Sequence, residues 1–428
     1  MKIAILGFGR EGLSAYEYWS KKGNEIVIHD NNEELKIPDG ANSVLGPDAF
    51  DDLDSYGYDL IVRSPGLRII VGSLKTPMAT PTNEFLIKCP AKVIGVTGSK
   101  GKGTTSTIIS KILSAAGFKT HLLGNIGKPA LDDLNNINKE DVVIYEMSSF
   151  QLYDIKNSPD VAVCLMVTQD HLDWHDDLQE YHESKGNIFN FQTPEDVAVY
   201  YSDNLISVNL AKESRAATKY TYGKDSDVSY ENGEIIAFGE KIININEIAL
   251  PGEHNLQNIC AAIAACRKFT TNKEAIREVL TTFIGLPYHI ELIREKDGIR
   301  YYNDSFSTNP TSAIAAARSF TEPEVLFFGG FNKNTDFNEL AKELVSKNIR
   351  KIITYGQTGE LIAETFKKEG IGEVEYIGGS DFNSIISKGI SYAKDGDVVV
   401  FSPGCASFDM FKDYLDRGNS FNEIINGL

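Results

Sequence analysis

Short apolar runs rich in β-branched residues alternate with longer stretches of helical character along the whole chain. Short apolar runs bounded by turn residues are typical of strands buried in a parallel sheet. We therefore predict an α/β fold with largely parallel sheets. The expected strands cover residues 3–6, 26–29, 60–62, 93–96, 142–145, 161–167, 325–328, 352–355 and 398–401.

The alternation divides into three blocks, each of the size of a nucleotide-binding domain. We predict a Rossmann-like domain at residues 1–90, a central P-loop ATPase-type α/β domain at 91–285 and a Rossmann-like C-terminal domain at 286–428. The last boundary falls where Gly285-Leu286-Pro287 breaks the helical pattern. The sequence contains no repeat of solenoid period and no low-complexity tract.

A glycine-rich loop at residues 97–105 follows the strand expected at 93–96 and precedes a helix-like stretch. Backbone N–H groups and a helix N-terminus form a phosphate site, and a lysine can reach the terminal phosphates of ATP. The common spacing has glycine where Val96 stands and Ser or Thr where Gly103 stands, so Thr104 is the nearest hydroxyl for magnesium. A turn without a ligand is the alternative. The candidate ATP contacts are Gly98, Ser99, Lys100, Gly101, Lys102, Gly103, Thr104 and Thr105.

A second glycine-rich turn follows the first expected strand. Gly7, Gly9 and Gly12 come directly after residues 3–6, and Asp30 closes the next strand. This is the pattern of a dinucleotide-binding turn. From these residues alone NAD, the pyrophosphate of another nucleotide and a purely structural turn all stay open.

Polar side chains crowd the ends of two neighbouring strands. Glu146 follows one apolar run, and His171, Asp173 and His175 follow the next. A carboxylate at the tip of a parallel strand beside a phosphate loop is well placed to hold magnesium. The alternative is a capping cluster that starts a helix, which suits Asp173 and leaves His171 unexplained.

Charge and cysteine usage exclude several classes of function. The formal charge of −18 argues against a general affinity for nucleic acids or anionic membranes, although a local basic cleft remains compatible with it. The five cysteines form no CxxC pair, which suits reduced thiols in the cytosol. We find neither a signal-peptide pattern nor an apolar run of membrane-spanning length, so we expect a cytoplasmic protein without membrane insertion.

Further segments with distinctive spacing occur in all three blocks. They are Ser64-Pro65-Gly66, Gly124-Asn125-Ile126-Gly127, Glu146-Met147-Ser148-Ser149-Phe150-Gln151-Leu152, Gly252 with His254-Asn255 and Asn258, Asn303-Asp304-Ser305, Thr308-Asn309, residues 402–411 and Arg417-Gly418. As a set they resemble the Mur ligases of peptidoglycan synthesis. The segments at 148–151 and 402–411 resemble the member of that family that adds glutamate.

The resemblance implies an ATP-dependent amide ligase that adds D-glutamate to UDP-N-acetylmuramoyl-L-alanine through an acyl phosphate, in the cytoplasm and as a monomer. The same ligation with L-glutamate and a catalytically weak binding protein on the same fold are the alternatives. An NAD-dependent dehydrogenase would leave the loop at 97–105 without a role. A folylpolyglutamate-type synthetase should lack the UDP site and the 402–411 segment.

The resemblance also assigns site residues. It implies two magnesium sites, and a carbamylated Lys185 would hold the metal where an ammonium would repel it. The implied catalytic residues are Lys102, Glu146, His171 and Lys185, and the implied metal ligands are Thr104, Glu146, His171 and Lys185 as its carbamate. Further implied ATP contacts are Asn258, His289 and Asp304. The implied UDP-sugar contacts are Gly7, Gly9, Arg10, Glu11, Asp30, Asn31, Gly66, Asn125, Ser148 and His171. The implied amino-acid contacts are Thr308, Lys333, Ser407, Phe408 and Tyr414.

Three positions depart from the family pattern. Gly103 removes a hydroxyl beside the loop lysine, His289 stands where an arginine is usual, and Phe306 replaces a lysine that some members have. Histidine is only partly charged near neutral pH, so we expect a weaker and more pH-dependent phosphate contact at His289. We also expect Thr104 or water to take over the magnesium contact left open by Gly103.

Overall fold

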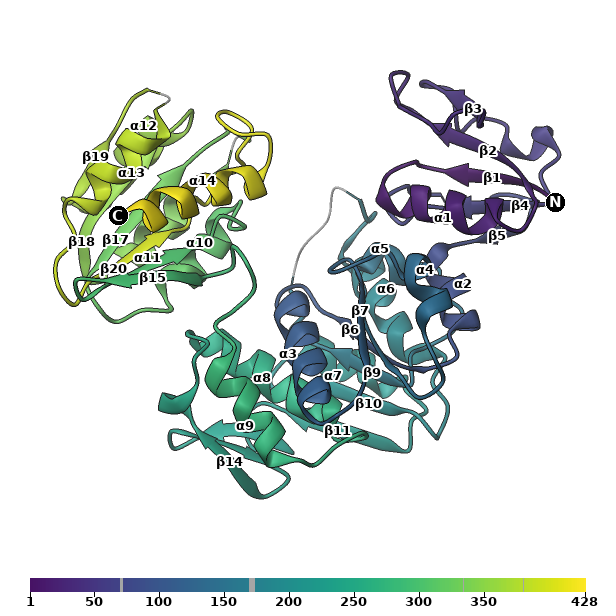
Figure 1. The fold of residues 1–428 in the computed structure, drawn as a ribbon, viewed down its shortest axis with the longest axis horizontal. Helices are drawn as coiled ribbons and strands as arrows, with labels where there is room; N and C mark the ends of the chain where they lie inside the picture. The colour runs from purple at the N-terminus through teal and green to yellow at the C-terminus, as the bar shows by residue number, and fades with distance from the viewer. Residues whose placement is uncertain (70–71, 169–173, 334, 380) are drawn as a thin grey trace. The chain divides into compact units, whose positions relative to one another are not determined.

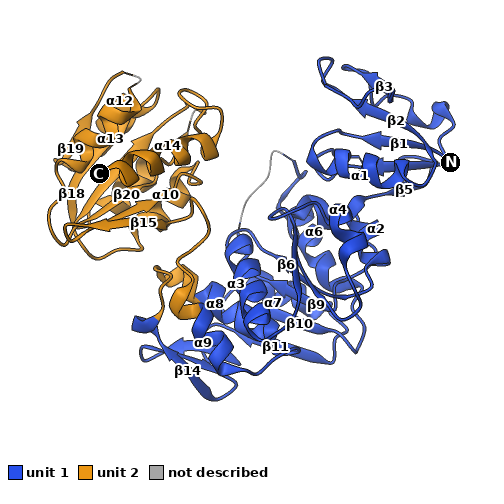
Figure 2. Cartoon of the chain, in the orientation of Figure 1, with its two compact units in different colours: residues 1–247, 257–279 blue, residues 248–256, 280–428 orange. Residues whose placement is uncertain are grey.

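The computed structural model describes residues 1–428 apart from 70–71, 169–173, 334 and 380 (Figure 1). The chain forms two compact units, residues 1–247 with 257–279 and residues 248–256 with 280–428 (Figure 2). The expected α/β fold is confirmed, since the described residues form three sheets in which parallel pairs predominate. Each sheet lies within one predicted domain, and the domain boundaries themselves stay predictions.

The first sheet has the strand order β3-β2-β1-β4-β5, and all neighbouring strands are parallel. Its central strand is buried from Ile3 to Leu6. Thr80 caps the second helix by accepting a hydrogen bond from the Asn83 N–H. The elements are β1 (Lys2–Leu6), α1 (Arg10–Ser20), β2 (Glu25–Asp30), β3 (Asn42–Leu45), a 3-10 turn (Leu53–Tyr56), β4 (Leu60–Arg63), β5 (Met78–Ala79) and α2 (Pro81–Lys88).

The second sheet has the order β14-β13-β12-β11-β10-β9-β6-β8-β7. It is parallel from β7 to β12 and ends in an antiparallel edge, β12-β13-β14, that the sequence did not predict. Its strands are β6 (Lys92–Thr97), β7 (Thr120–Gly124), β8 (Val142–Glu146), β9 (Val161–Cys164), β10 (Val197–Tyr201), β11 (Thr218–Tyr222), β12 (Val228–Glu231), β13 (Glu234–Ala237) and β14 (Glu240–Asn244). Its helices are α3 (Lys102–Ala115), α4 (Ala130–Asp133), α5 (Ser149–Leu152), α6 (Leu178–Asn190), α7 (Leu205–Lys212), α8 (Glu253–Cys266) and α9 (Lys273–Thr282), with 3-10 turns at Leu134–Asn136 and Ile245–Glu247.

One predicted strand is shorter than expected. β9 ends at Cys164, whereas the apolar pattern predicted a strand to residue 167. The N–H of Val167 donates to the Asn204 side chain, and the Asn204 amide donates back to the Val167 carbonyl. The Asn204 side chain, and not a neighbouring strand, is therefore the hydrogen-bond partner of the Val167 backbone.

The third sheet has the order β15-β16-β20-β17-β18-β19, with β15 antiparallel to β16 and the other pairs parallel. One face packs against α10, α11 and α12 and the other against α13 and α14, with a separate apolar core on each face. The elements are β15 (Glu291–Lys296), β16 (Ile299–Asn303), α10 (Pro310–Ala317), β17 (Glu324–Gly329), α11 (Asn338–Leu344), β18 (Ile349–Tyr355), α12 (Gly359–Lys368), β19 (Val374–Tyr376), α13 (Phe382–Ile390), β20 (Val398–Phe401) and α14 (Tyr414–Gly427).

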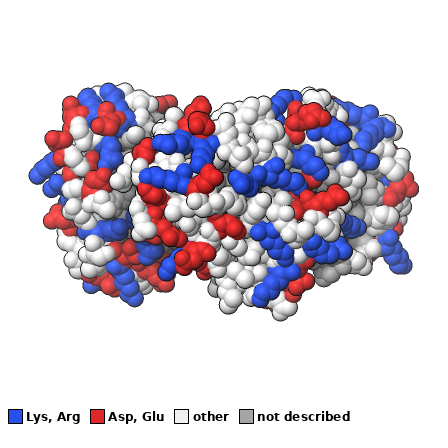
Figure 3. All heavy atoms as spheres, turned by 90° about the horizontal axis from the view of Figure 1, so that it is seen from below, with Lys and Arg blue, Asp and Glu red and all other residues white. Residues whose placement is uncertain are grey.

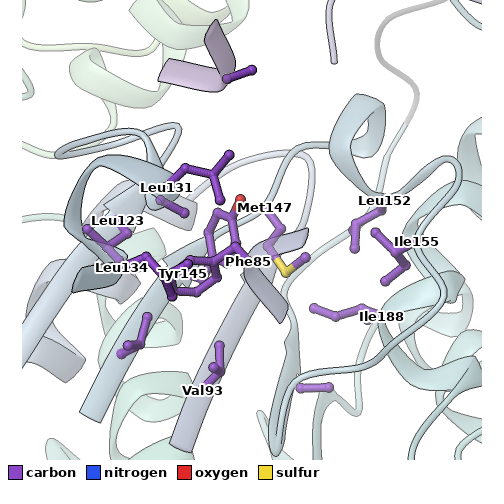
Figure 4. Packing of buried hydrophobic residues seen from close by; sticks show 14 of the residues in the cluster. Phe85, Val93, Leu123, Leu131, Leu134, Tyr145, Met147, Leu152, Ile155 and Ile188 are labelled. Carbon is purple, nitrogen blue, oxygen red and sulfur yellow. The ribbon is translucent and has the colours of Figure 1, made fainter. Parts of the chain in front are cut away.

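One apolar core joins the first sheet to the second. It runs from Ile3 and Trp19 of the first block into Leu131 and Tyr145 of the central block. Phe85 packs edge-on against Tyr145, with ring centroids 5.3 Å apart (Figure 4). Such an aromatic pair contributes about 1 kcal/mol beyond the area that it buries. The first block is therefore attached to the central block by packed side chains as well as by the chain.

Acidic and basic side chains are interspersed on the surface drawn in Figure 3. A mixed surface gives no broad field of one sign that would attract a polyanion. Within the described part of the chain, no helix has the length and apolarity needed to cross a membrane.

Glu324 provides a test of the third sheet. It is 1% exposed at the start of β17, and its Oε2 has no hydrogen-bond partner among the described residues. Burial raises the pKa of this carboxyl to about 8. Between pH 4.5 and about 8 the native state therefore keeps a proton that the unfolded chain releases, so stability falls as the pH rises through this window.

We expect Glu324→Gln to remove this loss and to raise the free energy of unfolding at pH 9 by roughly 2–4 kcal/mol relative to the wild type, with a much smaller gain at pH 5. Urea unfolding at the two pH values measures the difference. The exposed Glu339→Gln on α11 is the control. An equal gain at both pH values would contradict the proton linkage.

Candidate active site

The glycine loop joins β6 to α3 and is held in a narrow space. Gly98 and Gly101 have φ values of 152° and 84°. A Cβ atom at Gly98 would lie 2.6 Å from the Leu165 Cβ, and one at Gly101 would lie 2.2 Å from the Asn258 Oδ1. Only glycine fits these two positions, so the loop keeps its backbone close to its neighbours.

Lys102 is the first residue of α3 and bends back over the loop. Its Nζ donates to the carbonyl oxygens of Gly98 and Ser99, at 3.1 and 3.2 Å. The Ser99 hydroxyl lies 2.7 Å from the Tyr181 hydroxyl and 3.0 Å from the Thr168 carbonyl, so it ties the loop to the protein. A lysine over a glycine loop at a helix N-terminus is an arrangement that binds phosphate.

Lys185 reaches the same loop from α6. It is 1% exposed, and its Nζ donates to the Gly98 carbonyl oxygen at 2.9 Å. The Nζ also lies 4.8 Å from the centre of the Tyr181 ring. The fold thus brings Lys185 beside Lys102, as expected of a site residue, and the carbamate on Lys185 stays a prediction.

Glu146 ends β8, next to the end of β6. It is 5% exposed, and its Oε1 accepts a hydrogen bond of 3.2 Å from the Asn125 side chain. Burial raises the pKa of this carboxyl, while the Lys102 charge and the Asn125 hydrogen bond act in the opposite direction. Glu146 therefore offers a hard oxygen donor beside the loop, as a magnesium ligand requires.

Another predicted ligand, His171, lies outside the described residues, as does Asp173. Among those that are described, no group of three or more His, Cys, Asp or Glu side chains lies close enough together to hold a metal. His175 is 2% exposed and bonds to the Ser149 hydroxyl at 3.0 Å and the Glu180 carboxylate at 3.2 Å. Both ring nitrogens of His175 are therefore hydrogen-bonded within the protein.

The two threonines of α3 differ in accessibility. Thr105 is fully buried and donates to the Asn258 Oδ1 at 3.4 Å. Thr104 is partly exposed, as is Gly103, whereas Lys100 is exposed. Thr104 is therefore the hydroxyl of this pair that a metal ion can approach.

The turn after β1 has the second predicted site. The Asp30 Oδ2 accepts a hydrogen bond of 2.7 Å from the Phe8 N–H, and the Ser64 hydroxyl donates to the Gly7 carbonyl at 2.6 Å. Gly9 precedes α1 as its N-cap, and Asn31 is exposed. The predicted sugar-nucleotide residues Gly7, Gly9 and Asp30 are thus brought together at one turn.

Other predicted sugar contacts face the central block. The Arg10 guanidinium donates to the Gly127 carbonyl, beside Asn125. Ser148 caps α5 in a reciprocal capping box with Gln151. Burial raises the pKa of the Glu11 carboxyl to about 7, and its Oε2 has no hydrogen-bond partner among the described residues.

The predicted amino-acid residues lie in the second compact unit. The Lys333 Nζ is 5.8 Å from the centre of the Phe408 ring, and Phe408 is 60% exposed. Ser407 is 2% exposed, and Thr308 is partly exposed. Lys333 and Phe408 are thus brought together.

Asp304 is buried at the end of β16. Its two oxygens accept hydrogen bonds from the Ile290 N–H at 3.2 Å and from the Ser402 hydroxyl at 2.7 Å. Burial raises the pKa of this carboxyl to about 7. The carboxyl therefore links β16 to the segment that follows β20.

Two of the departures from the family pattern contact each other. The rings of His289 and Phe306 stack with centroids 4.0 Å apart, and Tyr414 meets Phe306 edge-on at 5.1 Å. The His289 Nδ1 lies 2.9 Å from the Pro287 carbonyl, which only accepts, so Nδ1 carries the proton. Burial lowers the pKa of His289, so its Nε2 is an acceptor at neutral pH.

Sequence reasoning missed Arg63, Asp154 and Trp174. The Arg63 guanidinium pairs with the Asp154 carboxylate, and the Trp174 indole N–H donates to the Gly66 carbonyl at 2.9 Å. Arg63 could have been noticed in the sequence, because it is a charged residue at the end of an apolar strand. A buried arginine at such a position needs an acidic partner.

The fold and the loop define an α/β protein with a phosphate site. Family models for the Mur ligase middle domain and for the Mur ligase glutamate ligase domain match residues 96–266 and 290–405. The chain is 35% identical to a UDP-N-acetylmuramoylalanine–D-glutamate ligase of Clostridium perfringens, covering 100% of this chain and 96% of that protein. For the protein of the same name from Clostridium tetani the identity is 37%, with 100% and 97% covered. The chain belongs to the Mur ligase family.

Two solved structures of other ligases have a fold similar to that of this chain. The UDP-N-acetylmuramate-alanine ligase MurC of Thermotoga maritima has a TM-score of 0.63 at 18% identity, covering 100% of this chain and 99% of that one. The MurF ligase of Thermotoga maritima, solved in complex with ADP, has a TM-score of 0.62 at 19% identity, covering 100% and 94%. The α/β architecture is therefore shared across the family.

Thr104 offers a test of the loop. We expect Thr104→Ala to raise the magnesium concentration for half-maximal ATP turnover by about tenfold, because a lost oxygen contact costs on the order of 1–2 kcal/mol. Thr104→Ser keeps the hydroxyl and is the matched control. Unchanged magnesium dependence in Thr104→Ala would show that this hydroxyl does not contact the metal.

His289 offers a second test. A protonated Nε2 can donate to a phosphate oxygen, and this form is lost as the pH rises through the lowered pKa, below 6.5. We expect the KM for ATP of the wild type to rise with pH in that range more steeply than that of His289→Arg, whose charge is constant. Initial rates from pH 5.5 to 8 measure the profiles, with the uncharged His289→Asn as control. Parallel profiles for wild type and His289→Arg would exclude the contact.

Proposed function

We propose that the protein joins D-glutamate to UDP-N-acetylmuramoyl-L-alanine with hydrolysis of ATP to ADP and phosphate. The main support is the meeting of Lys102, Lys185 and Glu146 at one glycine loop, in a chain whose full-length relatives have the name of this ligase.

A carboxylate and an amine do not condense in water, so the reaction needs an activated carboxyl group. The substrate carboxylate attacks the γ-phosphorus of ATP, the bond to ADP breaks, and an acyl phosphate forms. The uncharged amine of glutamate then attacks the acyl carbon, phosphate leaves with the bonding electrons, and the amine loses a proton. The protein must bring two anions together, which is mainly electrostatic work.

Lys102 and the loop N–H groups bind the β- and γ-phosphates in this proposal. Glu146, Thr104, His171 and the Lys185 carbamate would hold magnesium, which would supply positive charge to offset that of the phosphates. Lys185 starts as a buried amine beside the loop, and the uncharged form of such an amine reacts with carbon dioxide. Asn258, beside Gly101, contacts the nucleotide.

Recognition of the other two substrates follows the predicted residues. The Gly7 turn, Asp30 and Gly66 receive the UDP-sugar. Lys333, Thr308 and Ser407 supply one cation and two hydroxyls to a dicarboxylate. We further propose that the ligase works as a monomer in the cytoplasm, on small molecules alone.

Phosphate release tests the proposal. The wild type is assayed with ATP, magnesium and UDP-N-acetylmuramoyl-L-alanine, with D-glutamate, L-glutamate or no amino acid, and the product is weighed by mass spectrometry. We expect release and a glutamate adduct with D-glutamate only, and at least about a hundredfold loss in Lys102→Met. Adduct formation with L-glutamate alone would reverse the assigned enantiomer. If no phosphate is released with either enantiomer of glutamate, the ligase proposal fails and the alternative of a binding protein on the same fold is favoured.

A further inference from the structure

A buried ion pair links the first block to the central block. Arg63, the last residue of β4, has a side chain that is 0% exposed, and Asp154, which follows α5, has one that is 6% exposed. The pair is bidentate, with Nη2 to Oδ1 at 2.8 Å and Nε to Oδ2 at 3.1 Å. A buried ion pair often adds little net stability, because desolvation offsets the attraction. Its position in the fold is therefore more informative than its strength.

The same guanidinium binds the loop that follows it. Nη1 donates to the carbonyl oxygens of Pro65 at 3.0 Å and Leu67 at 2.8 Å, and Nη2 donates to that of Phe150 at 3.1 Å. A planar guanidinium can serve several acceptors in fixed directions, which a lysine cannot. Arg63 thus fastens residues 64–67 to α5.

Both fastened segments belong to proposed binding sites. The Ser64 hydroxyl bonds to the Gly7 carbonyl of the sugar-nucleotide turn. On the other side, α5 begins three residues after Glu146, the last residue of β8, which lies beside the phosphate loop. One side chain therefore connects the structure around the sugar-nucleotide turn to the strand tip at the ATP site.

A second set of contacts joins the same loop to the start of α6 and is more exposed. Arg68 pairs with Asp176 at 2.5 Å and with Glu180 at 2.9 Å, and the exposed fractions of these three side chains are 25%, 74% and 23%. Solvent and salt screen such pairs. Arg63 is the buried member of the connection, so it constrains the geometry most.

We propose that Arg63 is a positioning residue that holds loop 64–67, and with it the UDP-sugar substrate, at the correct distance from the ATP loop. This inference rests on the proposed function, in which the carboxylate of that substrate must reach the γ-phosphate. Displacement of a reacting group by about 1 Å can lower a rate by about a hundredfold. Arg63 acts through the loop and contacts neither phosphate nor carboxylate in the reaction.

The test separates positioning from stability. In the double variant Arg63→Met with Asp154→Leu, apolar side chains replace the ion pair, and such replacements are often close to neutral in stability. We expect a melting temperature near that of the wild type, a Kd for UDP-N-acetylmuramoyl-L-alanine raised about tenfold in calorimetry, and a lower kcat. The KM for ATP should change less than about twofold, since the phosphate loop is untouched. Arg63→Lys, which keeps the charge, should lie between the wild type and the double variant.

Arg350 and Asp397 supply the control, because they form a second bidentate pair, at 2.9 and 3.0 Å, in the other compact unit, with the Arg350 side chain 33% exposed. Arg350→Met with Asp397→Leu should leave the Kd for the UDP-sugar unchanged. The inference fails if the Arg63 variants bind and turn over the UDP-sugar like the wild type, or if the control loses affinity equally. If the wild type binds the UDP-sugar without releasing phosphate, the proposed ligation fails, and the calorimetric comparison still decides the role of Arg63.

Discussion

The carbonyl oxygen of Gly98 accepts hydrogen bonds from two ammonium groups, those of Lys102 and Lys185. Two like charges on one oxygen repel each other, and the repulsion is stronger in a buried loop than in water. A phosphate group bound at the loop would offset this repulsion, and the carbamate proposed for Lys185 would remove one of the two charges. The backbone that carries this carbonyl depends on glycine at 98 and 101, where a Cβ atom would meet Leu165 and Asn258.

The attachment of the first block to the central block depends on the apolar core that joins the first two sheets. Phe85, Leu131 and Tyr145 pack between them, and the Arg63–Asp154 pair lies at their junction. Apolar contacts attach the two blocks, whereas the directional hydrogen bonds of Arg63 fix residues 64–67, of which Ser64 bonds to the sugar-nucleotide turn. Apolar packing tolerates exchanges that conserve volume, whereas a bidentate pair adds geometric specificity. This division of roles suits an enzyme that must bring two bound substrates to a common point.

Sequence reasoning predicted the sheets well because strand formation and burial follow local apolar runs such as 142–145 and 398–401. It missed the antiparallel edge β12-β13-β14, where short strands gain their stability from pairing with each other. It predicted Lys102 from the glycine-rich loop before α3 and Glu146 from its place at the end of β8, which are both local patterns. It could not find the Arg63–Asp154 pair or the stacking of His289 on Phe306, since both join residues that are distant in sequence and obey no spacing rule.

The central claim is that the loop transfers the γ-phosphoryl group of ATP to a carboxylate. Labelling the free carboxylate of UDP-N-acetylmuramoyl-L-alanine with oxygen-18 tests this directly, because an acyl phosphate passes one carboxylate oxygen to the departing phosphate. The account predicts that phosphate released during ligation carries one labelled oxygen. Release of unlabelled phosphate together with the amide product would contradict it, since the carboxyl group would then have been activated in another way.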